Sequence, residues 1–159
     1  MNSDTILRQQ LLKLLQGGNA HLGFDQAVDD FPRDRINQRP PNVSYTPWHL
    51  LEHMRIAQSD ILEFIRDPEH VSPQWPAGYW PAQDAQTDLE GWEKTITAFR
   101  DDLRDLQRMV GDPETDLLAD LPHAPGYTIL REVLIVADHN AYHIGEFAIL
   151  RQVMRTWST

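Results

Sequence analysis

Apolar side chains recur every three or four residues in four long stretches of this sequence. The clearest stretch spans residues 87–110, where the apolar positions are Trp92, Ile96, Phe99, Leu103, Leu106 and Val110. This spacing places the apolar side chains on one face of a helix, at close to heptad intervals. Alternation of apolar and polar residues, which is typical of a half-buried strand, is weak along the whole chain. The sequence therefore predicts an all-α fold.

Helix-breaking residues separate these stretches and set the expected helix bounds. The expected helices run from about Ser3 to Gly17-Gly18, from about Leu22 to Pro32 as a shorter piece, from Thr46-Pro47 to Asp67-Pro68, from Thr87 to Gly111, and from Thr128 to about Arg155. Four long amphipathic helices predict a four-helix bundle. The loops at residues 32–45 and 67–86 are long enough for a crossover connection. We expect residues 1–159 to form a single domain.

The charge balance and the lack of cysteine exclude several classes of function. The chain has 14 basic and 24 acidic residues, a net charge of −10, and no cysteine. The negative charge disfavours nucleic acid and anionic membrane surfaces as partners, because both attract Lys and Arg. No apolar run approaches the ~20 residues of a membrane span, and the N-terminal residues lack a secretory signal pattern, so we expect a cytoplasmic protein. Without cysteine, a metal site has to use His, Asp or Glu.

Two histidines in the segment DHNAYHIGEF, residues 138–147, lie four residues apart in the last expected helix. His139 and His143 then share one helix face, with their Cβ atoms roughly 6 Å apart. Two imidazoles at that separation can bind one metal ion, with each nitrogen at about 2.1 Å. The alternative is a pair of hydrogen-bonded or half-exposed histidines. Position 140 is Asn, so the segment lacks the glutamate of an H-E-x-x-H metalloprotease motif.

The second long helix offers a third imidazole. His53 lies beside Leu50, Met54 and Ala57, close to the face that should contact the core. Helices in a bundle pack with their axes 8–10 Å apart, so His53 could complete a three-histidine set with the pair on the last helix. Three histidines leave a coordination position open for water or substrate, as in a catalytic site. His49, one turn earlier, is either a fourth ligand or an exposed or capping residue.

The remaining candidates have weaker patterns. His21 follows a helix break and could approach the end of the bundle, whereas His70 and His123 lie in loops and are expected to be solvated. Glu52 and Glu146, neighbours of the histidines, are candidate bases; Glu146 could also accept a hydrogen bond from a ligand, or be a solvated carboxylate. The aromatic segment Trp75–Pro81 is either a lid over the site or a loop that packs on the bundle.

The segments WHLLEHMRIAQSDILEF and DHNAYHIGEFAILRQ resemble the DinB-like (DinB/YfiT) superfamily of candidate metalloenzymes. The similarity extends from about Leu11 to the last helix. The resemblance implies a four-helix bundle with a long crossover and a divalent metal ion, commonly nickel or zinc, held by His53, His139 and His143. It also implies a homodimer. Members include thiol-dependent transferases, some of which use bacillithiol or mycothiol, and hydrolase-like proteins.

The leading expectation is a metal-dependent enzyme that acts on a small-molecule substrate. The ion would lower the pKa of a bound thiol or water. A thiol S-transferase would take its thiol from a low-molecular-weight cosubstrate, which fits a chain without cysteine, whereas a hydrolase would use Glu52 or Glu146 as base. The alternative is a non-catalytic bundle that binds metal, dimerises and serves in a stress response. A ferritin-like di-iron protein fits poorly, because the required glutamates and Glu-x-x-His sets are missing.

Overall fold

The computed structural model describes residues 2–158 and is mostly helical, in agreement with the predicted all-α class. Its helices are α1 (Ser3–Gln16), α2 (Phe24–Val28), α3 (Pro47–Arg66), α4 (Leu89–Gly111) and α5 (Ile129–Met154). Two single 3₁₀ turns, Arg33–Arg35 and Ala77–Tyr79, lie in the connections. Within the described residues, no helix is both long and apolar enough to cross a membrane.

Side-chain caps begin the long helices close to the predicted positions. Thr46 Oγ1 accepts a hydrogen bond from the His49 amide, and Pro47 occupies the first helical position, where no amide hydrogen is needed. Thr128 caps α5 in the same way. At α4 the cap is Asp88 rather than Thr87, one residue later than predicted. These local interactions explain why the helix starts could be inferred from the sequence.

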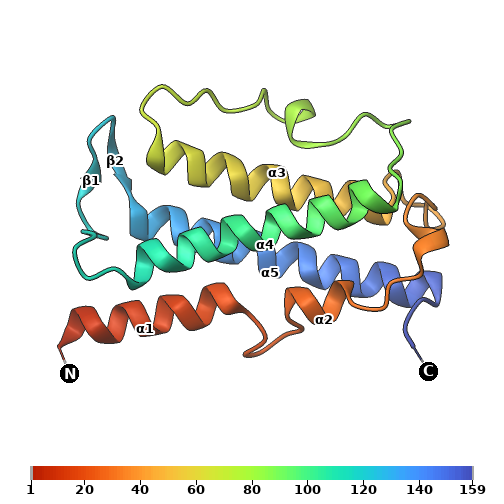
Figure 1. Ribbon diagram of the computed structural model, residues 1–159, viewed down its shortest axis with the longest axis horizontal. Coiled ribbons are helices and arrows are strands. Elements are labelled where there is room, and N and C mark those ends of the chain that lie inside the picture. Colours follow the sequence, from red (N-terminus) through yellow and green to blue (C-terminus); the bar gives the residue numbers. More distant parts are fainter. Residues whose placement is uncertain (1, 159) are drawn as a thin grey trace.

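The four long helices pack in pairs along their length. Helix α3 contacts α4 and α5, and α1 also contacts α4 and α5 (Figure 1). Helices α3 and α4 run in the same direction, because residues 67–88 return along α3 before α4 begins (Figure 1). We call residues 67–88 the covering loop. Its contacts with α3 run in reverse order, since Asp60 meets His70, His53 meets Tyr79, and His49 meets Ala85.

Two clusters of buried apolar side chains form the core, one at each end of the helices. One cluster includes Leu50, Met54, Phe99 and Phe147, and the stacked rings of Phe24 and Phe99, whose centroids are 4.0 Å apart, join α2 to it. The other cluster gathers Leu11, Leu62, Leu106, Val110 and Val133. Helices α3, α4 and α5 contribute to both clusters, so α3 and α5 are held in register at both ends. That register sets the separation of any side chains placed between them.

The connection between α4 and α5 differs from the prediction. A loop was expected, but β1 (Asp120–Leu121) and β2 (Ala124–Thr128) pair as a short antiparallel hairpin. Leu117 and Leu121 are buried against the second core cluster, which anchors the hairpin. Strand β1 is only two residues long, and β2 contains Pro125 and Gly126, which are turn signals, so neither strand shows a detectable alternation.

Candidate metal centre

Three histidines from two helices meet between α3 and α5. Helix α3 supplies His53, and α5 supplies His139 and His143, which one turn of helix places on the same face. The Nε2 atom of His53 lies 3.1 Å from that of His143 and 3.2 Å from that of His139. One ring nitrogen from each histidine lies within 4.8 Å of the other two. The structure therefore brings together the three histidines that the sequence singled out, and we call them the histidine trio.

Hydrogen bonds on the far side of two rings set their proton positions. The Nδ1–H of His53 donates to the Tyr79 carbonyl at 2.8 Å, and that of His143 donates to Glu146 Oε2 at 2.6 Å. A carbonyl and a carboxylate only accept hydrogen bonds, so Nδ1 carries the proton in both rings. Both Nε2 atoms then present lone pairs to each other. Two lone pairs at 3.1 Å repel, and a cation bound between them would remove that repulsion.

Burial favours the neutral form of His53 and His139, which is the form that binds metal. Burial lowers the pKa of His139 to about 4, with further lowering by its neighbours His143 and His53. Burial also lowers the pKa of His53, although the hydrogen bond to the Tyr79 carbonyl partly offsets this effect. Metal ligands have to be deprotonated at the binding nitrogen. His53 and His139 are therefore uncharged at neutral pH, as the chemistry of a histidine metal site requires.

Glu146 contacts the trio and is itself held at both oxygens. Its Oε2 accepts from His143, and its Oε1 accepts from the Tyr45 hydroxyl. Burial raises the pKa of Glu146, but the two hydrogen bonds outweigh burial and leave the pKa below its usual value. Burial and the hydrogen bond to Glu146 raise the pKa of Tyr45, so its hydroxyl remains a donor. Glu146 therefore accepts a hydrogen bond from His143, and its role beside a metal ligand stays a prediction.

The covering loop places an indole against the trio. The ring of Trp80 stacks on the imidazole of His53 with centroids 3.9 Å apart and planes 3° apart. Trp75, at the other end of the aromatic segment, is 74 % exposed. On the opposite side, the exposed ring of Tyr142 meets His143 edge-on at 4.9 Å. The sequence identified this aromatic segment without showing which ring would contact the site.

A comparison with protein families found a match that spans most of the chain. The family model of the DinB superfamily matches residues 23–147, which contain all three histidines. The chain belongs to the DinB superfamily. The match extends from just before α2 to the C-terminal half of α5 and leaves out α1. Comparisons with curated proteins and with solved structures gave no match for this DinB superfamily member.

Glu52, the other carboxylate predicted to act at the site, points elsewhere in this DinB superfamily chain. Its Oε1 accepts two hydrogen bonds from Arg55, and its Oε2 accepts one from Thr95 Oγ1 at 2.8 Å. One residue along a helix rotates a side chain by about 100°, so Glu52 faces α4 while His53 faces α5. The structure therefore does not bring Glu52 to the trio.

The remaining histidines stand apart from the trio. His49 is buried, not exposed as one alternative held, and its ring bonds the Ala85 carbonyl at 2.8 Å, so it attaches the covering loop instead of serving as a fourth ligand. His21 is exposed and bonds the adjacent Leu22 carbonyl. His70 and His123, which were expected to be solvated, are half-buried: His70 pairs with Asp60, and His123 bonds the Phe64 carbonyl. Both of these histidines bond to residues of α3, and no local sequence pattern indicates such contacts.

Sequence reasoning missed two of the groups that hold the trio. Tyr45 was assigned only to a loop, and Tyr79 was noted only as part of an aromatic stretch. Both act across the fold, Tyr45 on a residue 101 positions away and Tyr79 on a residue 26 positions away. The only local signal was the unusual concentration of aromatic residues in the covering loop.

Proposed function

We propose that this DinB superfamily protein is a metal-dependent enzyme in which His53, His139 and His143 hold a divalent cation. The observation that carries the proposal is the convergence of three ring nitrogens within 4.8 Å of one another, two of them with the tautomer suited to binding through Nε2. Imidazole suits nickel and zinc equally, so both are candidates. Three protein ligands leave coordination positions for a reactant.

When bound, the cation would lower the pKa of a coordinated thiol or water enough to give the anion near neutral pH. The protein's own residues orient the trio. Glu146 accepts the Nδ1 proton of His143 and places a negative charge behind that ring. The Trp80 indole covers one face of His53 and excludes water there. Tyr45 holds Glu146 in place from the side opposite His143.

The contacts of the carboxylates favour a thiol transferase over a hydrolase. A hydrolase needs a carboxylate free to take a proton from the bound water. Both oxygens of Glu146 already accept hydrogen bonds, and Glu52 is engaged with Arg55 and Thr95. A thiol is more acidic than water and needs less assistance to ionise. We therefore favour transfer of a low-molecular-weight thiol to a small electrophilic substrate, with the hydrolase as second candidate.

We also infer the overall form that the superfamily resemblance implies. The pairing of α1, α3, α4 and α5 supports a four-helix bundle, and the return of the covering loop along α3 supports its long crossover. The outer face of α5 supports a homodimer, because it exposes the apolar side chains of Ile135, Tyr142 and Ile149 at heptad spacing. The charge of −10 supports a protein that acts on a small molecule and not on nucleic acid, and we propose that it is cytoplasmic.

Elemental analysis of protein purified without a histidine tag tests the proposal. We expect about one equivalent of nickel or zinc per chain, and loss of that metal in His53→Ala. Exposed His21 provides the matched control, because His21→Ala should keep the metal. A screen of low-molecular-weight thiols with electrophilic substrates should then show turnover that depends on the metal. If the wild-type protein binds metal but turns over no thiol or ester substrate, the non-catalytic alternative is favoured. If the wild-type protein contains no metal, the proposal is overturned.

A further inference from the structure

Asp60 joins the covering loop to α3. Its carboxylate accepts a hydrogen bond from His70 Nε2 at 2.7 Å and another from the Tyr79 hydroxyl at 2.6 Å. The side chain of Asp60 is 11 % exposed, so these contacts are largely shielded from water. Asp60 follows His53 by seven residues, which is two helical turns or about 10 Å along the same face of α3. The two residues therefore face the same stretch of the covering loop.

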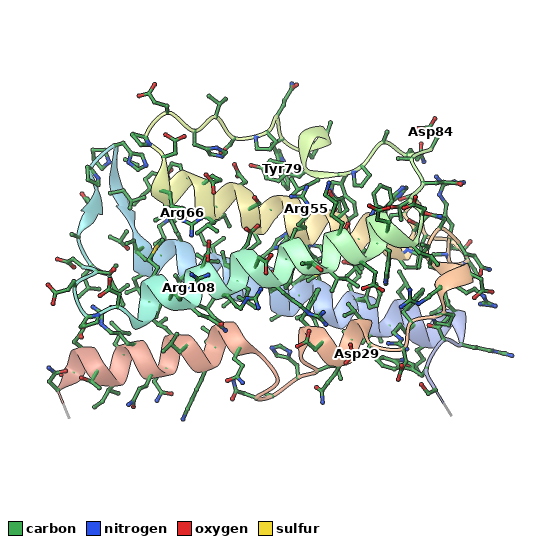
Figure 2. All side chains as sticks on the ribbon, viewed as in Figure 1. Asp29, Arg55, Arg66, Tyr79, Asp84 and Arg108 are labelled. Atoms are coloured by element: carbon green, nitrogen blue, oxygen red, sulfur yellow. The ribbon has the colours of Figure 1, made fainter. Side chains whose placement is uncertain are left out.

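Tyr79 binds α3 at two points. Its hydroxyl donates to Asp60, and its backbone carbonyl accepts the Nδ1 proton of His53 at 2.8 Å. Figure 2 shows Tyr79 between the covering loop and α3. Burial and the contact with Asp60 raise the pKa of Tyr79 to about 12, so the phenol keeps its proton and remains a donor. The next residue, Trp80, stacks on His53.

The turn that carries Tyr79 is tightly packed. A Cβ added at Gly78 would lie 2.8 Å from the Cβ of Pro73, which is closer than real contacts allow. The 3₁₀ turn Ala77–Tyr79 closes with a hydrogen bond from the Trp80 amide to the Ala77 carbonyl. Because the turn is packed in this way, the Tyr79 ring and the Tyr79 carbonyl cannot move independently of each other. Anchoring the ring therefore also anchors the acceptor of the His53 proton.

We propose that Asp60 is a positioning residue that sets the tautomer of His53 through Tyr79. By holding the Tyr79 ring, Asp60 keeps the Tyr79 carbonyl on Nδ1 of His53, and this leaves Nε2 unprotonated toward the trio. A ring with its proton on Nε2 offers the trio no lone pair. The effect on the tautomer concerns the metal-free protein, whereas the consequence for metal affinity rests on the proposed function.

The tautomer can be measured directly without metal. In ¹⁵N-histidine spectra of the metal-free protein at about pH 8, above the ordinary histidine pKa of about 6.5, His53 should be protonated at Nδ1. In Asp60→Ala we expect the tautomer ratio of His53 to shift roughly five-fold toward Nε2–H, the effect of one weakened hydrogen bond. Glu63→Gln, a charge change at a half-exposed carboxylate on the same helix, is the control and should leave the ratio unchanged.

The metal affinity is the second measurement. We expect the dissociation constant for Zn²⁺ alone to rise about ten-fold in Asp60→Ala, in the range found when groups that hold a ligand histidine are lost. Asp60→Asn should rescue much of both effects, because the amide oxygen can still accept from Tyr79. Tyr79→Phe should weaken both in the same direction as Asp60→Ala. The double variant should bind Zn²⁺ no more weakly than the weaker-binding single variant, because both changes remove the same Tyr79–Asp60 contact.

The outcomes separate this proposal from the proposed function. An unchanged His53 tautomer in both Asp60→Ala and Tyr79→Phe, with the helical circular dichroism retained, would overturn the positioning role. A tautomer that shifts in a protein that binds no Zn²⁺ would support the positioning role and overturn the metal centre. Should Asp60→Ala fail to fold, Tyr79→Phe decides the matter, because it keeps the aromatic ring and removes only the hydroxyl.

Discussion

Glu146 links the trio to a second layer of hydrogen bonds, and this makes it the most informative single residue. It accepts from His143 at one oxygen and from Tyr45 at the other, and the two bonds keep its pKa low although it is half-buried. A negatively charged acceptor makes the imidazole of His143 more basic, and therefore a stronger ligand for a metal ion. The candidate metal centre thus depends on residues that would not touch the metal.

Replacing Glu146 with Gln should weaken Zn²⁺ binding by about 10-fold or more, since the neutral amide removes the charge behind His143. Competition with a chromophoric chelator measures the affinity. Glu93→Gln, at a carboxylate that pairs with Arg33 on the surface, is the matched control and should leave the affinity unchanged. Equal affinity in wild type and Glu146→Gln would show that the carboxylate does not act on the trio.

The metal-free protein should lose stability as the pH falls from about 6.5 to about 4. The folded pKa of His139 is about 4 against an ordinary value of 6.5, so the unfolded chain binds more protons between these values. Stability therefore rises with pH across that window and declines as the pH drops. The lowered pKa of His53 acts in the same direction. Urea unfolding at a series of pH values measures this dependence.

The variant His139→Gln isolates the contribution of that ring. Its stability should vary less with pH between about 4 and 6.5 than that of the wild type, because the group that protonates on unfolding is gone. His21→Gln, at an exposed histidine outside the trio, should keep the wild-type slope. An identical slope in His139→Gln and wild type would contradict the lowered pKa of His139.

At the level of elements, two buried arginines tie helix ends to the rest of the fold. Arg151 of α5 donates to the carbonyls of Ala27 and Asp29 at 2.7 Å, at the C-terminal end of α2, and to the Thr156 carbonyl at 2.8 Å. Arg8 of α1 binds carbonyls at the C-terminal end of α4 in the same manner. Carbonyls at helix ends have no partner within the helix and carry partial negative charge, which a cation satisfies.

Arg151→Met should destabilise the protein by about 3 kcal/mol, because the charge-assisted hydrogen bonds are lost and buried carbonyls are left without a donor. Burial already lowers the pKa of Arg151, but its three carbonyl contacts and the Trp157 ring at 4.0 Å compensate the cation. The urea midpoint measures the change. Arg104→Met, at an exposed arginine, should change the free energy of unfolding by less than about 1 kcal/mol.

Across the whole molecule, α5 is apolar on both its inner and outer faces. The inner face contributes Val133, Ile144 and Phe147 to the core, while Ile135 and Ile149 are exposed on the outer face. Apolar side chains that gather on an exposed helix face indicate a contact surface. Between Ile135 and Ile149 this strip exposes one charged residue, Asp138, so in a chain with a net charge of −10 a second copy meets little repulsion there.

Ile149→Asp should convert the proposed homodimer into a monomer, because it places a charge within that apolar strip in both copies. Size-exclusion chromatography with light scattering gives the mass. Leu118→Asp introduces the same charge at an exposed apolar residue outside α5 and should leave the dimer intact. A monomeric wild type, or a variant that still dimerises, would contradict this interface.

The sequence by itself determined the helical class, the approximate helix ends and the pairing of His139 with His143 on one helix face. Each of these depends on local physics: the 3.6-residue period, caps such as Thr46 and Thr128, and the spacing of His139 and His143. Membership of the DinB superfamily agrees with that local evidence. The position of His53 beside the pair was expected only because a bundle brings its helices close together.

Only the tertiary structure decided which groups hold the trio. The contacts of Tyr45, Tyr79 and Trp80 join residues far apart in the chain, and the choice between Glu52 and Glu146 depended on the rotation of each helix about its axis. The hairpin between α4 and α5 and the burial of His49 have the same origin. Such contacts arise when packing fixes the direction of a side chain, and local sequence carries no information about the surface that it will meet.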